Sequence, residues 1–236
     1  MSSSLARRYA ARWPVSPGSL PPAPPELDTR QIARGASLLL VASVVCLALV
    51  PWVVSESYSV IEHTLSEAAG QGVRGGWLAR TGMILAAFAA FLLSATPALR
   101  WGPWSRLAHR LFGVFTVFIA IFEHSSFMEG ESDEFEGWIH TVVAIAAGVS
   151  FAIGVLLVAL EGRRLGRIPS AFDQAAFLAP MVLPLVMLLV DGIDGLAQRL
   201  MLAAGIWWYW LEARSVAGPA GVPRNRRRYR RSTARA

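Results

Sequence analysis

The sequence of 236 residues is 54% hydrophobic and only 16% charged, whereas soluble domains carry about 25% charged residues. Its apolar residues gather into long blocks and the mean hydropathy is +0.46, which excludes an ordinary soluble domain. The net charge of +6 comes from arginine alone because the chain contains no lysine. The single cysteine, Cys46, excludes an intramolecular disulfide and a cysteine-rich metal site.

The N-terminal segment, residues 1–33, is rich in arginine and proline, with prolines at 21, 22, 24 and 25. No run within it is apolar for long enough to form the core of a signal peptide. Prolines at this density favour an extended, solvated chain. We therefore expect residues 1–33 to be a disordered cytoplasmic tail.

Six apolar blocks follow, and we expect each to form one transmembrane helix of an all-α, polytopic membrane bundle. A helix of about 20 residues spans the hydrocarbon core and satisfies its own backbone hydrogen bonds there. Pro180 and Pro184 predict a kink in the fifth helix. The blocks lie at 35–54, 77–98, 107–123, 139–160, 174–191 and 195–211, within one membrane domain of residues 34–212.

Arginine is distributed unevenly between the connections, and this predicts that both ends of the chain lie in the cytoplasm. With the N-terminus inside, all of the 22 arginines except Arg74, Arg80 and Arg199 fall on the cytoplasmic side. Positive residues in short loops favour that side, and most of the acidic residues fall on the opposite one.

Tryptophans lie near the predicted helix ends on both sides, as in the aromatic belts of membrane proteins. Small residues recur at helical spacing in the second and fourth blocks, and we expect them to form packing faces within the bundle rather than a homodimer face. The tryptophans are Trp52, Trp77 and Trp138 at outer ends and Trp101, Trp104, Trp207, Trp208 and Trp210 at inner ends. The small residues are Gly82, Ala86 and Ala90, and Ala144, Gly148 and Ala152.

Three of the four histidines, His63, His124 and His140, fall on the predicted outer face together with Glu67. Imidazole and carboxylate groups bind zinc, and a catalytic zinc site uses three protein ligands and one open position. The spacing matches no established zinc motif, so these residues are low-priority candidates for a metal site. The alternatives are interfacial polar residues, which we favour, and a pH-sensing role. No catalytic residue is identified and no cofactor is expected, although zinc is conceivable.

Two further features of the outer face have structural interpretations. Ser66 and Glu67 lie outside any nucleophile-elbow motif, and Thr64 followed by Glu67 is typical of a helix capping box. Arg199 lies one turn into the sixth helix, where an unpaired charge would be costly. We expect it to pair with a carboxylate, with Glu67, Asp191 and Asp194 as candidates, and consider binding of an anionic substrate as the alternative.

The C-terminal tail, residues 213–236, contains a run of arginines between Arg224 and Arg231. Its composition is also found in nucleic-acid-binding arms. Because it follows the last helix on the cytoplasmic side, we expect it to bind anionic lipid headgroups instead, with no nucleic-acid partner.

Several motifs resemble the domain-of-unknown-function 998 family of prokaryotic multi-pass membrane proteins. They are His63-Thr64-Leu65-Ser66-Glu67 followed by a glycine-containing loop and Trp77-Leu78, the acidic loop before His140-Thr141, and Gly195-Leu196-Ala197-Gln198-Arg199. One departure is Phe122-Glu123-His124, where family members commonly show Phe-Pro and an acid. The resemblance implies a six-helix bundle in a prokaryotic cell membrane, but it supplies no activity.

Three functions are compatible with these patterns. We favour a non-enzymatic membrane protein that handles a lipid or a small solute between its helices. The alternative is a membrane-embedded, metal-dependent hydrolase with its site on the outer face. A secondary transporter ranks third, because none of the six blocks has an ionisable side chain near its midpoint.

Overall fold

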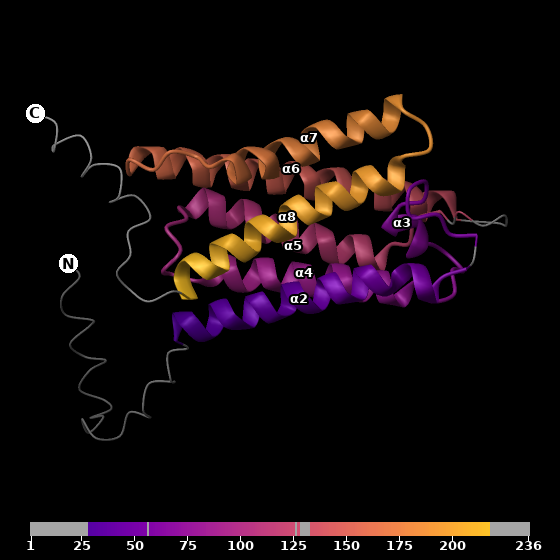
Figure 1. The fold of residues 1–236 in the computed structure, drawn as a ribbon, viewed down its shortest axis with the longest axis horizontal. Coiled ribbons are helices and arrows are strands. Elements are labelled where there is room, and N and C mark those ends of the chain that lie inside the picture. The colour runs from indigo at the N-terminus through magenta and orange to yellow at the C-terminus, as the bar shows by residue number, and fades with distance from the viewer. Residues whose placement is uncertain (1–27, 56, 126, 128–132, 218–236) are drawn as a thin grey trace, which may run out of the picture.

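The computed structural model describes residues 28–55, 57–125, 127 and 133–217, and within these residues every regular element is a helix. The helices form a bundle in which the long ones run side by side, with a short helix at one end (Figure 1). The polytopic helical bundle is therefore confirmed. Its elements are α2 (Thr29–Val53), α3 (Leu65–Ala68), α4 (Trp77–Ala95), α5 (Pro103–Ile121), α6 (Glu134–Arg164), α7 (Ala171–Leu189) and α8 (Asp194–Ala217).

Five of these helices, α2, α4, α5, α6 and α7, are long and apolar enough to cross a membrane. The helix α8 corresponds to the predicted sixth span, but Gln198, Arg199 and Glu212 make it less apolar than the other five. With 24 residues it is long enough to span, and it packs against α2, α4 and α7 inside the same bundle. Gln198, Arg199 and Glu212 of α8 have hydrogen-bond partners inside the bundle.

The described chain begins and ends on the same side of the bundle (Figure 1). We call this side, with the α4–α5 and α6–α7 connections, the terminal end, and the opposite side the α3 end. The helix α2 begins at Thr29, inside the predicted tail, because the Asp28 side chain caps it by accepting a hydrogen bond from the amide of Arg30. At the other extreme, α8 continues to Ala217, and the arginine run lies outside the described residues.

The close contact between α2 and α4 depends on one small residue. A Cβ atom on Gly82 would lie 2.7 Å from the Leu47 side chain, and Ser43 Oγ donates a hydrogen bond of 2.7 Å to the Gly82 carbonyl. Of the packing face predicted for the second span, Gly82 thus lies at the contact with α2 and Ala90 is buried, whereas Ala86 lines the central cavity. In the other stripe, Ala152 is buried, whereas Ala144 and Gly148 line a cavity.

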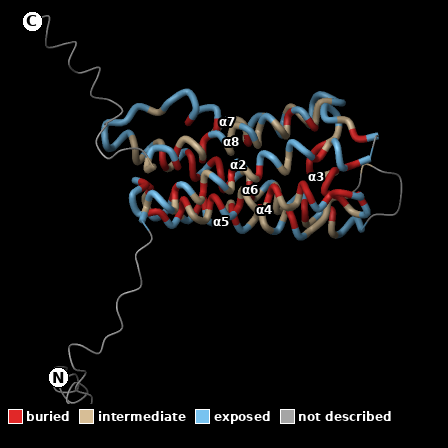
Figure 2. The backbone as a smooth tube through the Cα atoms, turned by 60° about the horizontal axis from the view of Figure 1, so that its bottom comes forward, coloured by how far each residue is buried: buried red, intermediate tan, exposed pale blue. Residues whose placement is uncertain are grey.

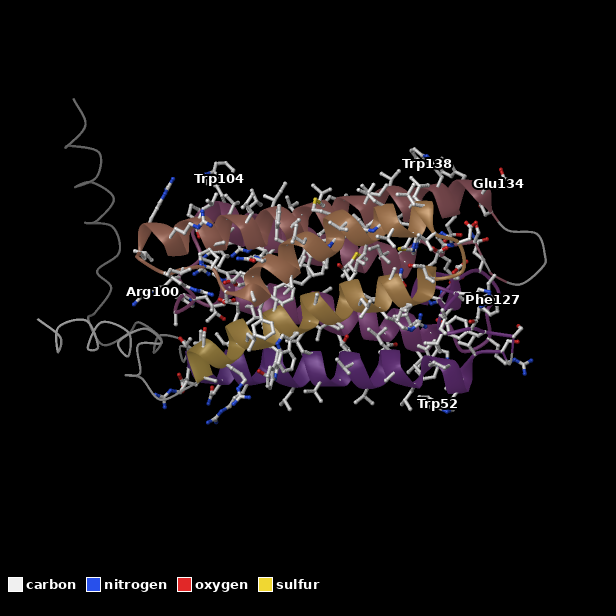
Figure 3. The ribbon with its side chains drawn as sticks, turned by 45° about the horizontal axis from the view of Figure 1, so that its top comes forward. Trp52, Arg100, Trp104, Phe127, Glu134 and Trp138 are labelled. Atoms are coloured by element: carbon white, nitrogen blue, oxygen red, sulfur yellow. The ribbon has the colours of Figure 1, made fainter. Side chains whose placement is uncertain are left out.

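Buried residues line the inner sides of the long helices and exposed residues their outer sides (Figure 2), and many of the exposed side chains are large and apolar. Leu38, Ile145 and Leu188 are 70%, 63% and 79% exposed, as expected of side chains that face lipid. Trp52 and Trp138 project near the α3 end and Trp104 near the terminal end (Figure 3), in the positions of an aromatic belt. The helix α7 continues through both of its prolines.

A central cavity as the candidate functional site

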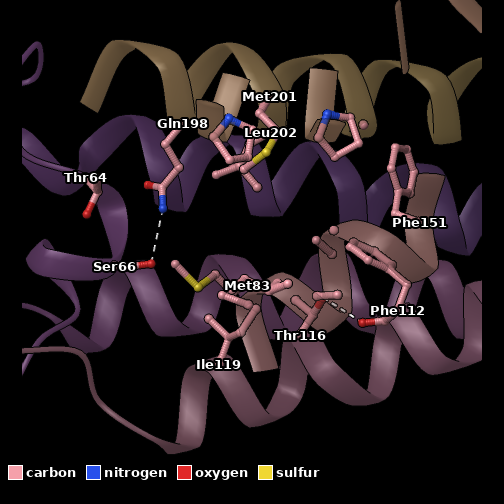
Figure 4. Close-up of a pocket in the computed structure, with 18 of the residues that line it drawn as sticks. Thr64, Ser66, Met83, Phe112, Thr116, Ile119, Phe151, Gln198, Met201 and Leu202 are labelled. Carbon is pink, nitrogen blue, oxygen red and sulfur yellow. Dashed lines mark hydrogen bonds between the residues drawn. The ribbon is translucent and has the colours of Figure 1, made fainter. Parts of the chain in front are cut away.

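A cavity of about 410 Å³ lies between the six long helices. Most of its wall is apolar and comes from facing helices, with Met83 of α4, Phe112 of α5 and Leu202 of α8 among the lining residues (Figure 4). Two polar groups deeper in the wall are already engaged. Thr116 Oγ1 donates to the Phe112 carbonyl at 2.8 Å, and the Tyr209 hydroxyl is bonded to His109.

The other polar residues of the wall all come from the α3 end: Thr64, Ser66, His124, His140, Thr141 and Gln198. They are brought together by the first turn of α8, the start of α6, the residues after α5, and α3 with its cap. No aspartate, glutamate or arginine is among the described residues that line the cavity. The cavity is therefore an uncharged, apolar space with one polar end.

The polar end is ordered by hydrogen bonds across the chain. The amide of Leu65 donates to Gln198 Oε1 at 2.6 Å, and Gln198 Nε2 donates to Ser66 Oγ at 3.2 Å (Figure 4). The predicted capping box is also present, since Thr64 Oγ1 accepts from the amide of Glu67 while Glu67 Oε2 accepts from the amide of Thr64. Ser66 is therefore held by the amide of Gln198, and the Glu67 carboxylate is engaged in capping α3.

The structure brings two of the three outer histidines together. The rings of His124 and His140 are 5.0 Å apart, and both line the cavity. The ring of His63 instead stacks on Phe127 at 4.7 Å, and its Nδ1 accepts from the amide of Ser59 at 2.9 Å. Within the described ranges, no three His, Cys, Asp or Glu side chains are placed to hold a metal ion.

The prediction that Arg199 pairs with a carboxylate is wrong. Among the described residues, the guanidinium donates to the carbonyls of Val60 and His63 at 2.8 and 3.0 Å, to the carbonyl of Gly195 and to the hydroxyl of Tyr58. The segment before α3 turns its carbonyls toward α8, and these supply enough acceptors for the charge.

The neighbours of Arg199 are consistent with this structural role. Burial raises the pKa of Tyr58, although the charge of Arg199 opposes the shift, so the phenol keeps its proton and donates to the Thr64 carbonyl. Asp194 begins α8, and its Oδ1 is buried with no hydrogen-bond partner in the described part of the chain. Asp191 lies exposed in the turn between α7 and α8.

The protein family described as "Protein of unknown function (DUF998)" matches residues 35–215 of the sequence. The chain belongs to this family. The match includes almost all of the six long helices and every residue of the cavity wall. No curated protein and no solved structure matches the chain. The family description names no activity, so the function of this DUF998 protein has to be inferred from its own cavity.

A polar cluster that the sequence patterns did not indicate lies at the terminal end of the DUF998 bundle; its carboxylates are buried and its arginine, Arg167, is exposed. Trp208 Nε1 donates to Asp173 Oδ1 at 3.0 Å, and Trp101 Nε1 donates to Glu212 Oε2 at 3.1 Å. Arg167 lies 3.4 and 3.5 Å from these two carboxylates. The cluster joins the start of α7 to the end of α8, and to the α4–α5 connection.

Trp101 and Trp208 were predicted to lie in the inner aromatic belt, and this is wrong. They are only 5% and 1% exposed, and they enclose His109, whose ring lies 4.4 and 5.1 Å from theirs. Their indole N–H groups have carboxylate partners inside the bundle, so they gain nothing from the headgroup region. The sequence did contain a signal for these buried partners, because Asp173 and Glu212 are acidic residues on the arginine-rich side.

Proposed function

We propose that this protein binds a lipid-like or other small amphiphilic molecule in its central cavity and handles it without chemical conversion. The observation that carries the proposal is the distribution of polarity in the cavity wall: along the helices it is apolar apart from Thr116 and Tyr209, whose hydroxyls are already hydrogen-bonded, and its other polar residues lie at the α3 end. An apolar chain with a polar head has the same asymmetry. The volume of about 410 Å³ lies in the range of roughly 300–1,000 Å³ typical of ligand pockets.

The exposure of the wall between α6 and α7 supports entry of the ligand from the bilayer. Ile145 and Val149 of α6 line the cavity and are also 63% and 41% exposed, and Pro184 of α7 lines it and is exposed. The buried residues of α7, Asp173, Ala176 and Pro180, all lie in its first half. The second half of α7 thus covers the cavity loosely, with lipid outside it.

Binding is favoured over hydrolysis by the chemistry of the polar end. A catalytic zinc needs three protein ligands, whereas the described residues bring two histidines together. A serine nucleophile needs a base, whereas the group bonded to Ser66 Oγ is the amide of Gln198. We further propose that the protein lies in a prokaryotic plasma membrane with both ends in the cytoplasm, supported by the arginine distribution, and that the C-terminal arginines bind anionic headgroups.

A cavity-filling substitution tests this proposal. A Cβ atom on Gly205 would meet Phe151 at 3.5 Å, an ordinary contact, so a leucine there can be accommodated and its branch fills the cavity. Ala203, two residues before Gly205 and on the exposed side of α8, provides the matched control. In lipid nanodiscs, Gly205→Leu should weaken binding of a tritiated long-chain alcohol at least tenfold, while Ala203→Leu should leave it unchanged. Equal binding by both variants would contradict the proposal.

A further inference from the structure

The hydrogen bonds of His140 fix which of its nitrogens can receive a ligand. Its Nδ1 lies 2.7 Å from the Phe122 carbonyl, and a carbonyl only accepts, so Nδ1 carries the hydrogen. In the neutral imidazole, Nε2 then has a free lone pair. This Nε2 is buried and has no hydrogen-bond partner in the described part of the chain, and His140 lines the cavity while being only 2% exposed. Unpaired buried acceptors are costly, so a donor is missing here.

Ser66 offers the complementary group at the same end of the cavity. The Leu65 amide fixes Gln198 Oε1 as an acceptor, so the group facing Ser66 is the Gln198 amide nitrogen, which donates to Ser66 Oγ. The hydroxyl hydrogen of Ser66 has no acceptor among the described residues and is available to a ligand. The polar end thus combines an acceptor on His140 with a donor on Ser66.

The arginines on the helices nearest this end are already engaged. Arg80 is paired with Glu123, and Arg199 is bonded to main-chain carbonyls and Tyr58. A carboxylate or phosphate head would lose its hydration in the cavity without a countercharge, which is costly. It would also bring no hydrogen for His140 Nε2. An uncharged hydroxyl can donate to His140 and accept from Ser66, and costs far less to desolvate.

We infer that the ligand is an uncharged single-chain amphiphile with a hydroxyl head, held at the polar end of the cavity by His140 Nε2 and Ser66 Oγ. This inference rests on the proposed function. One chain is expected because the cavity volume lies toward the lower limit of ligand pockets. The class includes long-chain alcohols and monoacylglycerols, and it excludes fatty acids and phospholipids as the preferred ligands.

Three probes with one chain length separate the contributions of the head. Tritiated 1-decanol is bound to the full chain in nanodiscs at pH 8 and competed with unlabelled decanol, its methyl ether or decanoate. Decanol should bind at least tenfold more tightly than either competitor, because the ether lacks the hydrogen and decanoate carries an unpaired charge. The variant His140→Asn tests the contact, since an asparagine amide can still donate to the Phe122 carbonyl but has no group in the place of Nε2.

In His140→Asn, decanol affinity should fall about tenfold, equivalent to about 1.4 kcal/mol, to the level of the ether, whose affinity should not change. Ser66→Ala provides a second test in case His140→Asn does not fold. It should lower the affinity for decanol by a smaller factor and leave the affinity for the ether unchanged. Preferred binding of decanoate, or an equal loss for alcohol and ether in His140→Asn, would overturn the inference. If every probe binds Gly205→Leu and Ala203→Leu alike, the cavity proposal itself fails instead.

Discussion

Replacing Arg199 by leucine should destabilise the bundle, because this side chain ties the segment before α3 to α8. The substitution removes hydrogen bonds to two carbonyls of that segment and to the Tyr58 hydroxyl. Hydrogen bonds to charged groups contribute about 1.5–3 kcal/mol each. Arg199 is half-buried, so we take roughly 1 kcal/mol for each of the three bonds, or about 3 kcal/mol in total.

A loss of about 3 kcal/mol corresponds to a fall in Tm of roughly 6–12 °C for a domain of this size. The measurement is thermal unfolding of the purified protein in one detergent, followed by the fluorescence of its tryptophans. Arg74→Leu is the matched control, because Arg74 is exposed in the α2–α4 connection. Arg199→Lys should recover only part of the loss, since an ammonium group cannot reproduce the planar fork of donors. Equal Tm values for Arg199→Leu and Arg74→Leu would refute the reasoning.

Three further predictions address other parts of the molecule. Gly154→Ala should cost about 1–3 kcal/mol of stability, because the added Cβ would lie 2.7 Å from the buried ring of His109. Gly148→Ala should be close to neutral, because its nearest neighbour would lie at 3.8 Å. The stability of both variants is measured by denaturation. A reporter after Arg235 should be cytoplasmic and one near Ser132 external, and an external C-terminus would contradict the predicted orientation. Metal analysis of the purified protein should find no stoichiometric zinc, and zinc lost on single substitution of each outer histidine would restore the metal-site hypothesis.

The helices were predictable because each apolar block is long enough to span the bilayer and few other structures can satisfy a backbone there. The residues at which the helices begin and end were less predictable. The helix α5 begins at Pro103 rather than residue 107 because the Glu161 carboxylate accepts hydrogen bonds from the Gly102 amide and the Ser105 hydroxyl. A contact between residues so far apart in the chain leaves no local pattern, although Pro103 at the first position of the helix is itself a start signal that the prediction did not use.

The candidate site was only partly predictable, for a different reason. The sequence places His140 near a helix end, but the rotation of α6 about its axis decides whether the ring faces lipid, loop or cavity. The same limit explains Trp208 of α8, whose side chain faces into the bundle; Trp101 lies in the α4–α5 connection, whose path the sequence does not indicate. Arg199 shows another limit, because every residue has a carbonyl and its partners therefore carry no recognisable residue type.

The composition of α8 has a consequence for the biosynthesis of the protein. A helix with Gln198, Arg199 and Glu212 partitions poorly into lipid by itself, and its neighbours in the bundle include α2 and α7, which precede it in the chain. Insertion of α8 should therefore depend on α2 and α7 being in the membrane already, so that α8 can pack against them. A chain truncated before Asp194 would lack the contacts of α8 with α2 and α7 and should be recognised by membrane quality control as an unfinished bundle.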